Sequence, residues 1–428
     1  MFDPMFVPPR HHPGLFWFAR TFVPRLGRLF GNVHAVTVAP EDLERLRALR
    51  EHRAILSPNH PTETDPIVMF WLSGLVGERF NFLSTRETLE GPRGWCLNRI
   101  GAYSVIRGYP DRESIRATRR LLAEEDRKVV IFPEGLVYEH NNRLLQFQSG
   151  VPQMGFWALD DLEKAGKAPR LPVVPLAIRY RCCAPPEPAI ERGLSAVEEK
   201  LRVKRKGTPY ERIVRLGSHV VAILEREEEL KPDESLDLTT RITRVRQQVL
   251  QRVARSVGAT LDEHQTPGEQ LHMLYNEVKE WIGPTPEEPA AYELQRYQQR
   301  ATAGAALFSE LARLNNTVAV TGNYIASEPT AERFLEVLGR LQKEVLGRVR
   351  HQAPLAAVMR AAPPIWLDER LAEYRQNKRQ TVADVTRQMQ ETIRTMLQES
   401  AQLSTPLGPE AGVEARGEPA EVTTHQNP

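Results

Sequence analysis

The stretch "AILSPNHPTETDPIVMF", Ala54 to Phe70, decides the fold. A short β-rich run, Ala54–Ser57, is followed by a polar segment bracketed by prolines and then by an apolar segment. Pro66 suits the first turn of a helix, where the N–H that proline lacks would have no partner. The stretch therefore predicts a strand-to-helix corner, which is where α/β sheets bind their ligands.

The sequence on both sides of this corner alternates between β-rich and helical patterns. Such alternation predicts an α/β domain, a mixed and largely parallel sheet flanked by helices, over residues 33–185. The expected strands are "VHAVTV", "AILS", "FNFLST", "YSVI", "KVVIF" and "VVPLAIRY", and the expected helices are Pro66–Gly74, Asp111–Glu125 and Val151–Ala165.

The chain changes character after Cys183, where a proline-rich loop leads into long charged stretches with apolar residues at helical spacing. No convincing strand is visible there, so we expect residues 186–403 to form an α-helical C-terminal region. Residues 404–428 hold few large apolar residues and are expected to be a disordered tail. The expected helices are Glu211–Glu229, Leu236–Val257, Pro267–Ile282, Ala290–Ala312, Thr330–Arg350 and Ile365–Gln402.

Residues 1–32 form an amphipathic N-terminal segment, in which aromatic residues and arginines alternate from Gly14 to Phe30. This composition suits a helix lying among anionic lipid headgroups. A helix that packs into the core, kinked at Pro24, is the other interpretation. The apolar residues at near-helical spacing are Leu15, Phe18, Phe22, Leu26 and Leu29.

Length and composition limit the classes of protein to which this chain can belong. A chain of 428 residues suggests more than one domain. The 57 Lys and Arg residues nearly balance 55 Asp and Glu residues, so a nucleic-acid partner is not expected. The longest uncharged apolar run, Pro66–Gly77, is shorter than the roughly 20 residues of a membrane-spanning helix. Three cysteines, two of them adjacent, favour a reducing, cytoplasmic compartment.

For two further features, a structural role is the first interpretation. His11 and His12 lie outside any Cys/His cluster with zinc spacing, so no metal site is expected. The basic run Lys200–Lys206 is expected to be a solvated linker, with contact to anionic headgroups as the second interpretation.

His60 and Asp65 straddle the predicted corner. A carboxylate that orients one ring nitrogen lets the other act as a general base, which contributes roughly 10²–10⁴-fold in rate. On the residues alone, a structural helix cap is the first interpretation of this pair. Since no Gly-x-Ser-x-Gly sequence supplies a nucleophile, the hydroxyl that His60 activates could belong to the substrate.

Two other predicted strands end in residues that could touch a substrate. Arg107 suits a phosphate, and Glu134 with Gly135 could hold hydroxyls, although a surface arginine and a plain turn are the alternatives. Pro172 and Pro175 indicate an edge strand or a special close-packed conformation.

Taken in order, these elements resemble the glycerophospholipid acyltransferase family, typified by 1-acylglycerol-3-phosphate O-acyltransferase. The resemblance covers about residues 30–185 and implies an α/β fold of the glycerolphosphate acyltransferase type. The matching motifs are Asn-His-x4-Asp at Asn59, His60 and Asp65, a Gly-led strand from Gly101 to Arg107, Phe-Pro-Glu-Gly at Phe132–Gly135, and Val174–Pro175.

The resemblance also implies the roles of these residues. His60 and Asp65 are the expected catalytic pair, and Asn59, Arg107, Glu134 and Gly135 the expected substrate-binding residues. The chain departs from the family after Gly135, where Leu136–Tyr138 replaces the usual Thr-Arg-Ser, and Arg143 could substitute for the missing arginine.

The implied reaction moves an acyl group from acyl-CoA or acyl-carrier protein to a lysophospholipid or glycerol-phosphate-type hydroxyl. No cofactor, no metal and no nucleic acid is expected. The expected location is the cytoplasm, peripherally on the inner face of the membrane. The same chemistry on an amino-lipid or glycolipid, and a non-catalytic lipid-binding scaffold, are the alternatives.

Overall fold

The computed structural model divides into two compact units. The first is formed by Met1–Cys183 and Pro354–Leu403, and the second by Ala184–Ala353 and Ser404–Pro428. The structure describes residues 6–50, 52–105, 111–135, 137, 140–141, 144–265, 267–283, 291–318 and 324–413.

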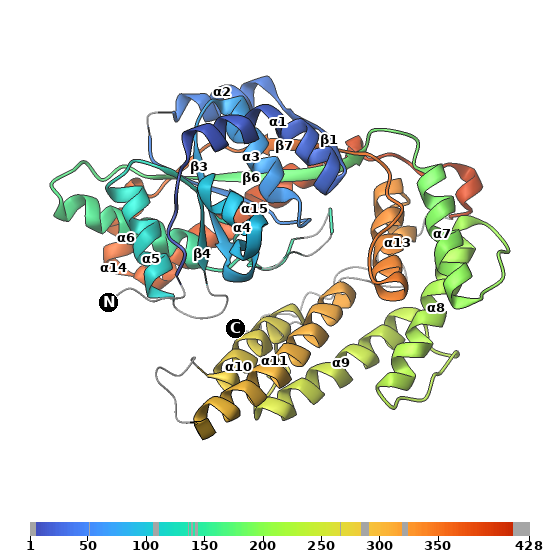
Figure 1. The fold of residues 1–428 in the computed structure, drawn as a ribbon. Helices are drawn as coiled ribbons and strands as arrows, with labels where there is room; N and C mark the ends of the chain where they lie inside the picture. Colours follow the sequence, from blue (N-terminus) through green and yellow to red (C-terminus); the bar gives the residue numbers. More distant parts are fainter. Residues whose placement is uncertain are drawn as a thin grey trace. The chain divides into compact units, whose positions relative to one another are not determined.

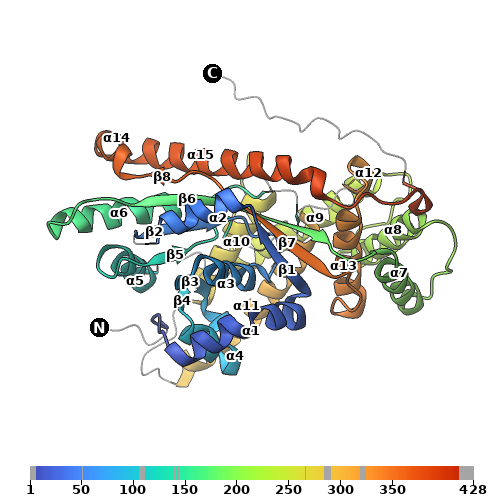
Figure 2. The same cartoon turned by 90° about the horizontal axis from the view of Figure 1, so that it is seen from above.

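The described part of the first unit contains an eight-stranded sheet with helices on both faces (Figures 1 and 2). The strand order is β1-β7-β6-β2-β5-β3-β4, and β8 pairs with β6. Only the pairs of β6 with β7 and β8 are antiparallel, so the predicted mixed, largely parallel sheet is confirmed. The strands are β1 Val33–Val38, β2 Ala54–Pro58, β3 Phe80–Thr85, β4 Ala102–Val105, β5 Lys128–Val130, β6 Pro172–Cys182, β7 Leu355–Ala361 and β8 Ile365–Trp366.

Strands β7 and β8 correct the expectation that no strand follows Cys183. The run "LAAVMRA" of β7 consists mostly of helix-favouring residues, but pairing with β1 on one side and β6 on the other overrides that propensity. The helical pattern expected from Ile365 begins only at Leu371, with α14 Leu371–Gln376 and α15 Lys378–Glu399. Residues 354–403 thus belong to the first unit rather than to a C-terminal helical region.

Helices cover the sheet in two layers, each with its own apolar core. The neighbouring residues Ile55 and Leu56 of β2 face opposite cores, as the two-residue period of a strand requires. Figure 2 shows α15 lying along β6 on one side of the sheet. One layer is α1 Pro13–Gly31, α2 Pro40–Ala48, α3 Asp65–Val76 and α4 Gly91–Arg99, and the other is α5 Arg112–Ala123, α6 Gly150–Lys164, α14 and α15.

Helix α1 packs one face into the core and leaves large apolar side chains exposed on the other. It runs unbroken past Pro24 and buries Phe16 and Val23 against α3, with Phe16 and Phe70 in an edge-to-face contact. The stripe read from the sequence is not the buried one, because Phe18 is 50% and Leu29 76% exposed. Among the described residues, no helix has the length and apolarity to cross a membrane.

The second unit is helical in its described residues, with one core among α7, α8 and α13 and another among α9, α10 and α11. Residues 404–413 are not a loose tail, since Ala331 N donates to Thr405 O at 2.8 Å and Ala411 is buried. The rest of the expected tail, 414–428, lies outside the described residues. The helices are α7 Glu187–Leu201, α8 Pro209–Glu227, α9 Leu238–Val257, α10 Pro267–Ile282, α11 Ala291–Val318, α12 Tyr324–Ser327 and α13 Ala331–Leu346.

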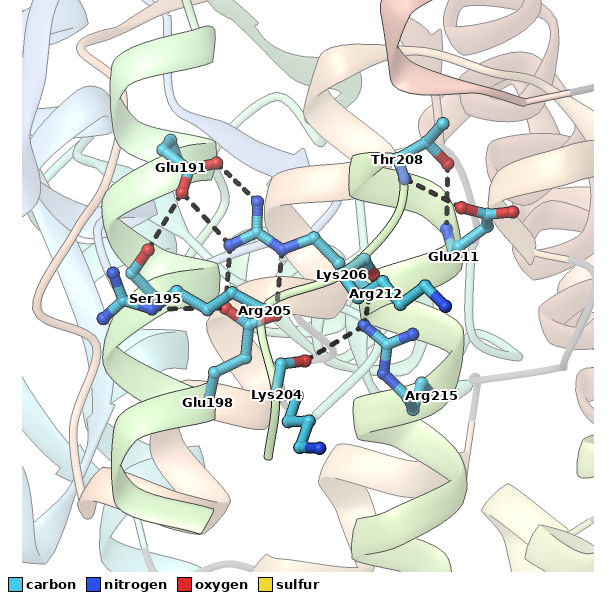
Figure 3. Close-up of polar contacts among 10 residues, drawn as sticks. All are labelled: Glu191, Ser195, Glu198, Lys204, Arg205, Lys206, Thr208, Glu211, Arg212 and Arg215. Carbon is cyan, nitrogen blue, oxygen red and sulfur yellow. Dashed lines mark hydrogen bonds and ion pairs between the residues drawn. The ribbon is translucent and has the colours of Figure 1, made fainter. Parts of the chain in front are cut away.

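The basic run Lys200–Lys206 starts in the last turn of α7 and continues as the connection to α8, with its arginine and lysine side chains exposed, as predicted for a solvated linker (Figure 3). Arg212 of α8 donates to Glu198 of α7 at 2.7 and 2.8 Å, which fixes the two helices at the turn. Arg215 of α8 donates to the Lys204 and Lys206 carbonyls, so the backbone of this connection is held against α8.

Candidate active site

The strand-to-helix corner forms as the sequence predicts. β2 ends at Pro58 and α3 begins at Asp65, whose carboxylate is fully buried. His60 Nδ1 lies 2.7 Å from Asp65 Oδ2, and the imidazole is 12% exposed. Because the carboxylate accepts the hydrogen on Nδ1, Nε2 is the ring nitrogen that can take a proton from a substrate. The geometry is therefore that of a histidine oriented as a general base.

Two residues that the sequence did not single out hold Asp65 in place. Tyr180 Oη donates to Asp65 Oδ1 at 2.6 Å, and Thr62 donates to Oδ1 from Oγ1 at 3.0 Å and to Oδ2 from its backbone N at 2.8 Å. Burial, followed by the charge of Asp65, raises the pKa of Tyr180 well above its ordinary value, so the phenol stays a donor. The available signal was a tyrosine between two arginines near the end of a strand whose carboxyl end lies beside that of β2.

Glu134 links the corner to the segment that follows the Phe-Pro-Glu-Gly sequence. Its Oε1 accepts the backbone N–H of His60 at 2.7 Å, and its Oε2 accepts that of Leu145 at 2.8 Å. Burial raises the pKa of Glu134 to about 7, while the two backbone donors act in the opposite direction. Both carboxylate oxygens thus have partners in the protein, and the residue fixes the position of the His60 backbone.

Asn59 and Asn141 continue the pairing of β6 beyond the end of β2. The Asn59 side chain accepts from Ile178 N at 2.7 Å and donates to Ile178 O at 3.0 Å. Asn141 makes the same pair of contacts with Tyr180, accepting from its N at 2.6 Å. Each amide substitutes for a neighbouring strand, so the predicted substrate-binding residue Asn59 has both ends of its side chain on the protein backbone.

Gly135 and Phe132 set the local geometry around His60. Gly135 has a φ of 69°, and a Cβ there would lie 2.6 Å from Gln148 Nε2, so only glycine fits without strain. The Phe132 ring stacks on the His60 imidazole, with centroids 3.9 Å apart and planes 20° from parallel. Within the Phe-Pro-Glu-Gly sequence, Phe132 thus stacks on the His60 ring, and Glu134 accepts a hydrogen bond from the His60 backbone.

The two prolines of β6 do not mark an edge strand, because β6 lies between β2 and β7. Pro175 sits where the antiparallel partner of β6 changes from β8 to β7, and its carbonyl accepts from Ala362 N at 3.0 Å. Its missing N–H therefore falls at a break in the ladder, which is the special conformation that the sequence left open.

Two predicted site residues cannot be placed. Arg107 follows β4 and Arg143 follows Asn141, and both lie outside the described residues. Their roles stay predictions. Among the described residues, no group of three or more His, Cys, Asp and Glu side chains could hold a metal ion.

A comparison with protein families gives a match to the segment that contains this corner. Residues 35–179 match the model of the family described as Acyltransferase, which spans β1 to most of β6 and includes the His60 corner. A search of curated proteins finds no match to the chain. The chain therefore carries a domain of the acyltransferase family at residues 35–179.

Proposed function

We propose that the first unit transfers a fatty acyl group from an acyl thioester, acyl-CoA or acyl-carrier protein, to a hydroxyl of a lysophospholipid or glycerol-phosphate-type acceptor. The observation that carries the proposal is the 2.7 Å contact between His60 Nδ1 and the buried Asp65 carboxylate. The family match supports acyl transfer in general, and the choice of acceptor and donor rests on the motif resemblance.

The proposed reaction needs one base and no protein nucleophile. His60 Nε2 removes the proton of the acceptor hydroxyl, and the oxygen attacks the thioester carbonyl carbon. The C–S bond then breaks as the C–O bond of the ester is completed, and the departing thiolate takes the proton back from the imidazolium. Asp65 keeps Nδ1 protonated and stabilises the imidazolium while it exists.

The roles of the other residues divide between substrate and scaffold. Arg107 is proposed to bind the acceptor phosphate through its planar fork. Glu134 and Asn59 contribute by holding the His60 backbone and the end of β2, as their contacts with His60 N and Ile178 indicate. Gly135 permits the turn that brings the Glu134 carboxylate to that loop.

The acceptor is proposed to come from a membrane surface, with the enzyme peripheral to the inner, cytoplasmic face. Trp17 and Phe30 lie on α1 and are 67% and 70% exposed, beside exposed arginines of the same helix. The carboxyl end of α1 reaches the corner, because a Cβ at Gly31 would overlap the Thr64 side chain. An interfacial helix ending at the His60 loop suits an enzyme that takes its acceptor from a bilayer.

Mass spectrometry of lipids made by the purified protein tests this function. The protein is incubated with mixed acyl-CoA donors and a panel of acceptors that includes lysophosphatidic acid, an amino-lipid and a glycolipid. His60→Ala is expected to abolish product while the variant still folds, because Tyr180 and Thr62 still donate to the Asp65 carboxylate. Activity close to wild type in His60→Ala, or no product with any acceptor, would contradict the proposal.

A further inference from the structure

A polar cavity of about 420 Å³ lies in the first unit at the edge of the sheet opposite the His60 corner. One side of it is lined by α1 and the rest by residues at the amino ends of β2, β3 and β5, whereas His60 follows the carboxyl end of β2. The lining residues are Pro13, Phe16, Trp17 and Arg20 of α1, Arg50, Gly77, Glu78, Arg79, Asp126, Arg127 and Lys128.

The charge of this lining is positive. Five of its residues are Arg or Lys and two are Glu or Asp. Both acidic residues are already paired, Glu78 with Lys128 at 2.7 Å and Asp126 with Arg53, which lies outside the lining. A ligand entering the cavity therefore meets an excess of cations whose nearby carboxylates are occupied.

Three of the five cations hold the protein itself together. Arg20 donates to Gly74 O at 2.9 Å and Arg50 to Val76 O at 2.8 Å, so both satisfy carbonyls at the carboxyl end of α3. Lys128 is almost fully buried and donates to the His52 carbonyl at 3.0 Å as well as to Glu78. These contacts leave Arg79 and Arg127 as the cations that face a ligand.

Arg79 and Arg127 line the same cavity from the segments that precede β3 and β5. Arg79 lies 5.3 Å above the Phe16 ring, and Arg127 Nε lies 3.9 Å from the Glu125 carboxylate, beyond hydrogen-bond distance. Two guanidinium forks in one cavity match the oxygens of a phosphate group.

An exposed aromatic side chain of α1 lies at the rim of the cavity. Trp17 lines the cavity and is 67% exposed, and Phe18, the next residue, is 50% exposed. An aromatic residue beside a basic cavity is the combination that places a headgroup at the interface and a ring among the upper acyl chains.

We propose that this cavity binds the phosphate of a phospholipid headgroup in the bilayer, with Arg79 and Arg127 as its ligands. The site is separate from the acceptor site at His60 and orients α1 on the membrane. The inference rests on the proposed function only for its choice of a lipid as the phosphate carrier, and its test measures binding without acyl transfer.

Co-sedimentation of the full-length chain with two kinds of vesicle tests the site. One kind is phosphatidylcholine alone, and the other is an equimolar mixture with phosphatidylglycerol. Arg79→Ala/Arg127→Ala is compared with Arg112→Ala/Arg394→Ala, which removes the same charge from exposed positions of α5 and α15 on the other face of the sheet. Arg79→Ala alone, at an exposed position, replaces the double variant if that variant melts earlier than wild type.

The wild type and the control pair should bind the mixed vesicles more tightly, and the Arg79/Arg127 pair should bind them roughly thirty-fold less tightly than wild type, as loss of two interfacial cations implies. Equal binding of the two variants would overturn the site.

Calorimetry with inorganic phosphate and glycerol 3-phosphate distinguishes a lipid headgroup from a soluble phosphate compound. Saturable binding of either compound in the absence of vesicles, lost in the Arg79/Arg127 pair, would assign the cavity to a soluble phosphate and overturn the headgroup.

Discussion

Tyr180 and Asp65 meet at 2.6 Å through the phenol oxygen and Oδ1, although 115 positions separate them in the chain. Tyr180 lies near the end of β6 and Asp65 begins α3, so the contact ties the helix that carries the carboxylate to the central strand of the sheet. The imidazole of His60 depends on that carboxylate for its orientation, which makes Tyr180 the first positioning residue to test.

Tyr180→Phe should lower kcat about ten- to a hundred-fold and leave KM for both substrates nearly unchanged. The variant removes one hydrogen bond to a buried carboxylate, a loss of about 1.5–3 kcal/mol, but keeps the ring in the core. Steady-state kinetics of the purified variant is the measurement. A variant that changes KM and leaves kcat as in the wild type would show that Tyr180 contacts substrate instead of positioning Asp65.

The sequence was sufficient for the corner because its information is local. Ala54–Ser57, Pro66 and the His60–Asp65 spacing lie within one stretch, and strand and helix formed there close to the predicted bounds. The alternation of strands and helices up to Cys182 was equally readable, apart from α2 and α4, which are short helices with little apolar periodicity.

What the sequence could not supply are contacts between distant segments. Nothing local marks Leu355–Ala361 as a strand, since its composition favours a helix and its partners β1 and β6 lie far away along the chain. The contacts of Glu134 with His60 N and Leu145 N likewise exist only after the sheet forms. A glutamate at a strand end looks the same in sequence whether it binds substrate or backbone.

Glu134 should make the stability of the first unit depend on pH. Its pKa is about 7 in the folded protein against 4.5 for the ordinary carboxyl, so the folded state holds the proton more tightly. The stabilisation from this proton is complete below about pH 4.5 and is lost as the pH rises through 7, with a total on the order of 3 kcal/mol.

Denaturant unfolding of wild type and Glu134→Gln between pH 4.5 and 8 measures this effect. The glutamine does not titrate, and its NH₂ group faces either His60 N or Leu145 N, so the variant should be less stable at low pH. The difference should shrink as the pH approaches 7 and stay constant above about pH 8. A difference that is independent of pH would mean that the folded pKa is not raised.

The exposed side chains of α1 should contribute to membrane binding without contributing to folding. Phe18→Ser, Leu29→Ser and Phe30→Ser combined should reduce co-sedimentation with phosphatidylcholine vesicles and leave the melting temperature unchanged, since each side chain is at least half exposed. Val23→Ser is the matched control on the buried face of the same helix. It should lower the melting temperature, because it places a hydroxyl in the core.

Deletion of residues 1–30 would not test the same point, because Phe16 and Val23 are part of the core against α3. If the triple serine variant binds vesicles as the wild type does, α1 is not the membrane contact. If it loses stability together with Val23→Ser, the exposed face is covered in solution.

Most of the second unit, Ala184–Ala353, is inserted into the first between Cys183 and Pro354, and its remaining segment follows Leu403, so both segments should be removable together. The chain leaves the first unit after Cys183 and returns at Pro354, and Cys183 N donates to Pro354 O at 2.9 Å. A chain that ends at Leu403 and in which a short glycine–serine linker replaces residues 184–353 should therefore close without strain and fold cooperatively. Circular dichroism and thermal unfolding report on the fold of this shortened chain.

The matched comparison is a chain that ends at Cys183 and keeps the whole family-matched segment. It lacks β7, β8 and α15, so it exposes one side of β6 and the core face beneath α15, and it should aggregate. A soluble, folded chain 1–183 would mean that β7 and α15 are dispensable to the sheet. The described hydrogen bonds of His60, Asp65, Tyr180 and Glu134 all lie within the first unit. The acyl transfer rate of the linker chain therefore shows whether the His60 corner works without the helices between residues 184 and 353.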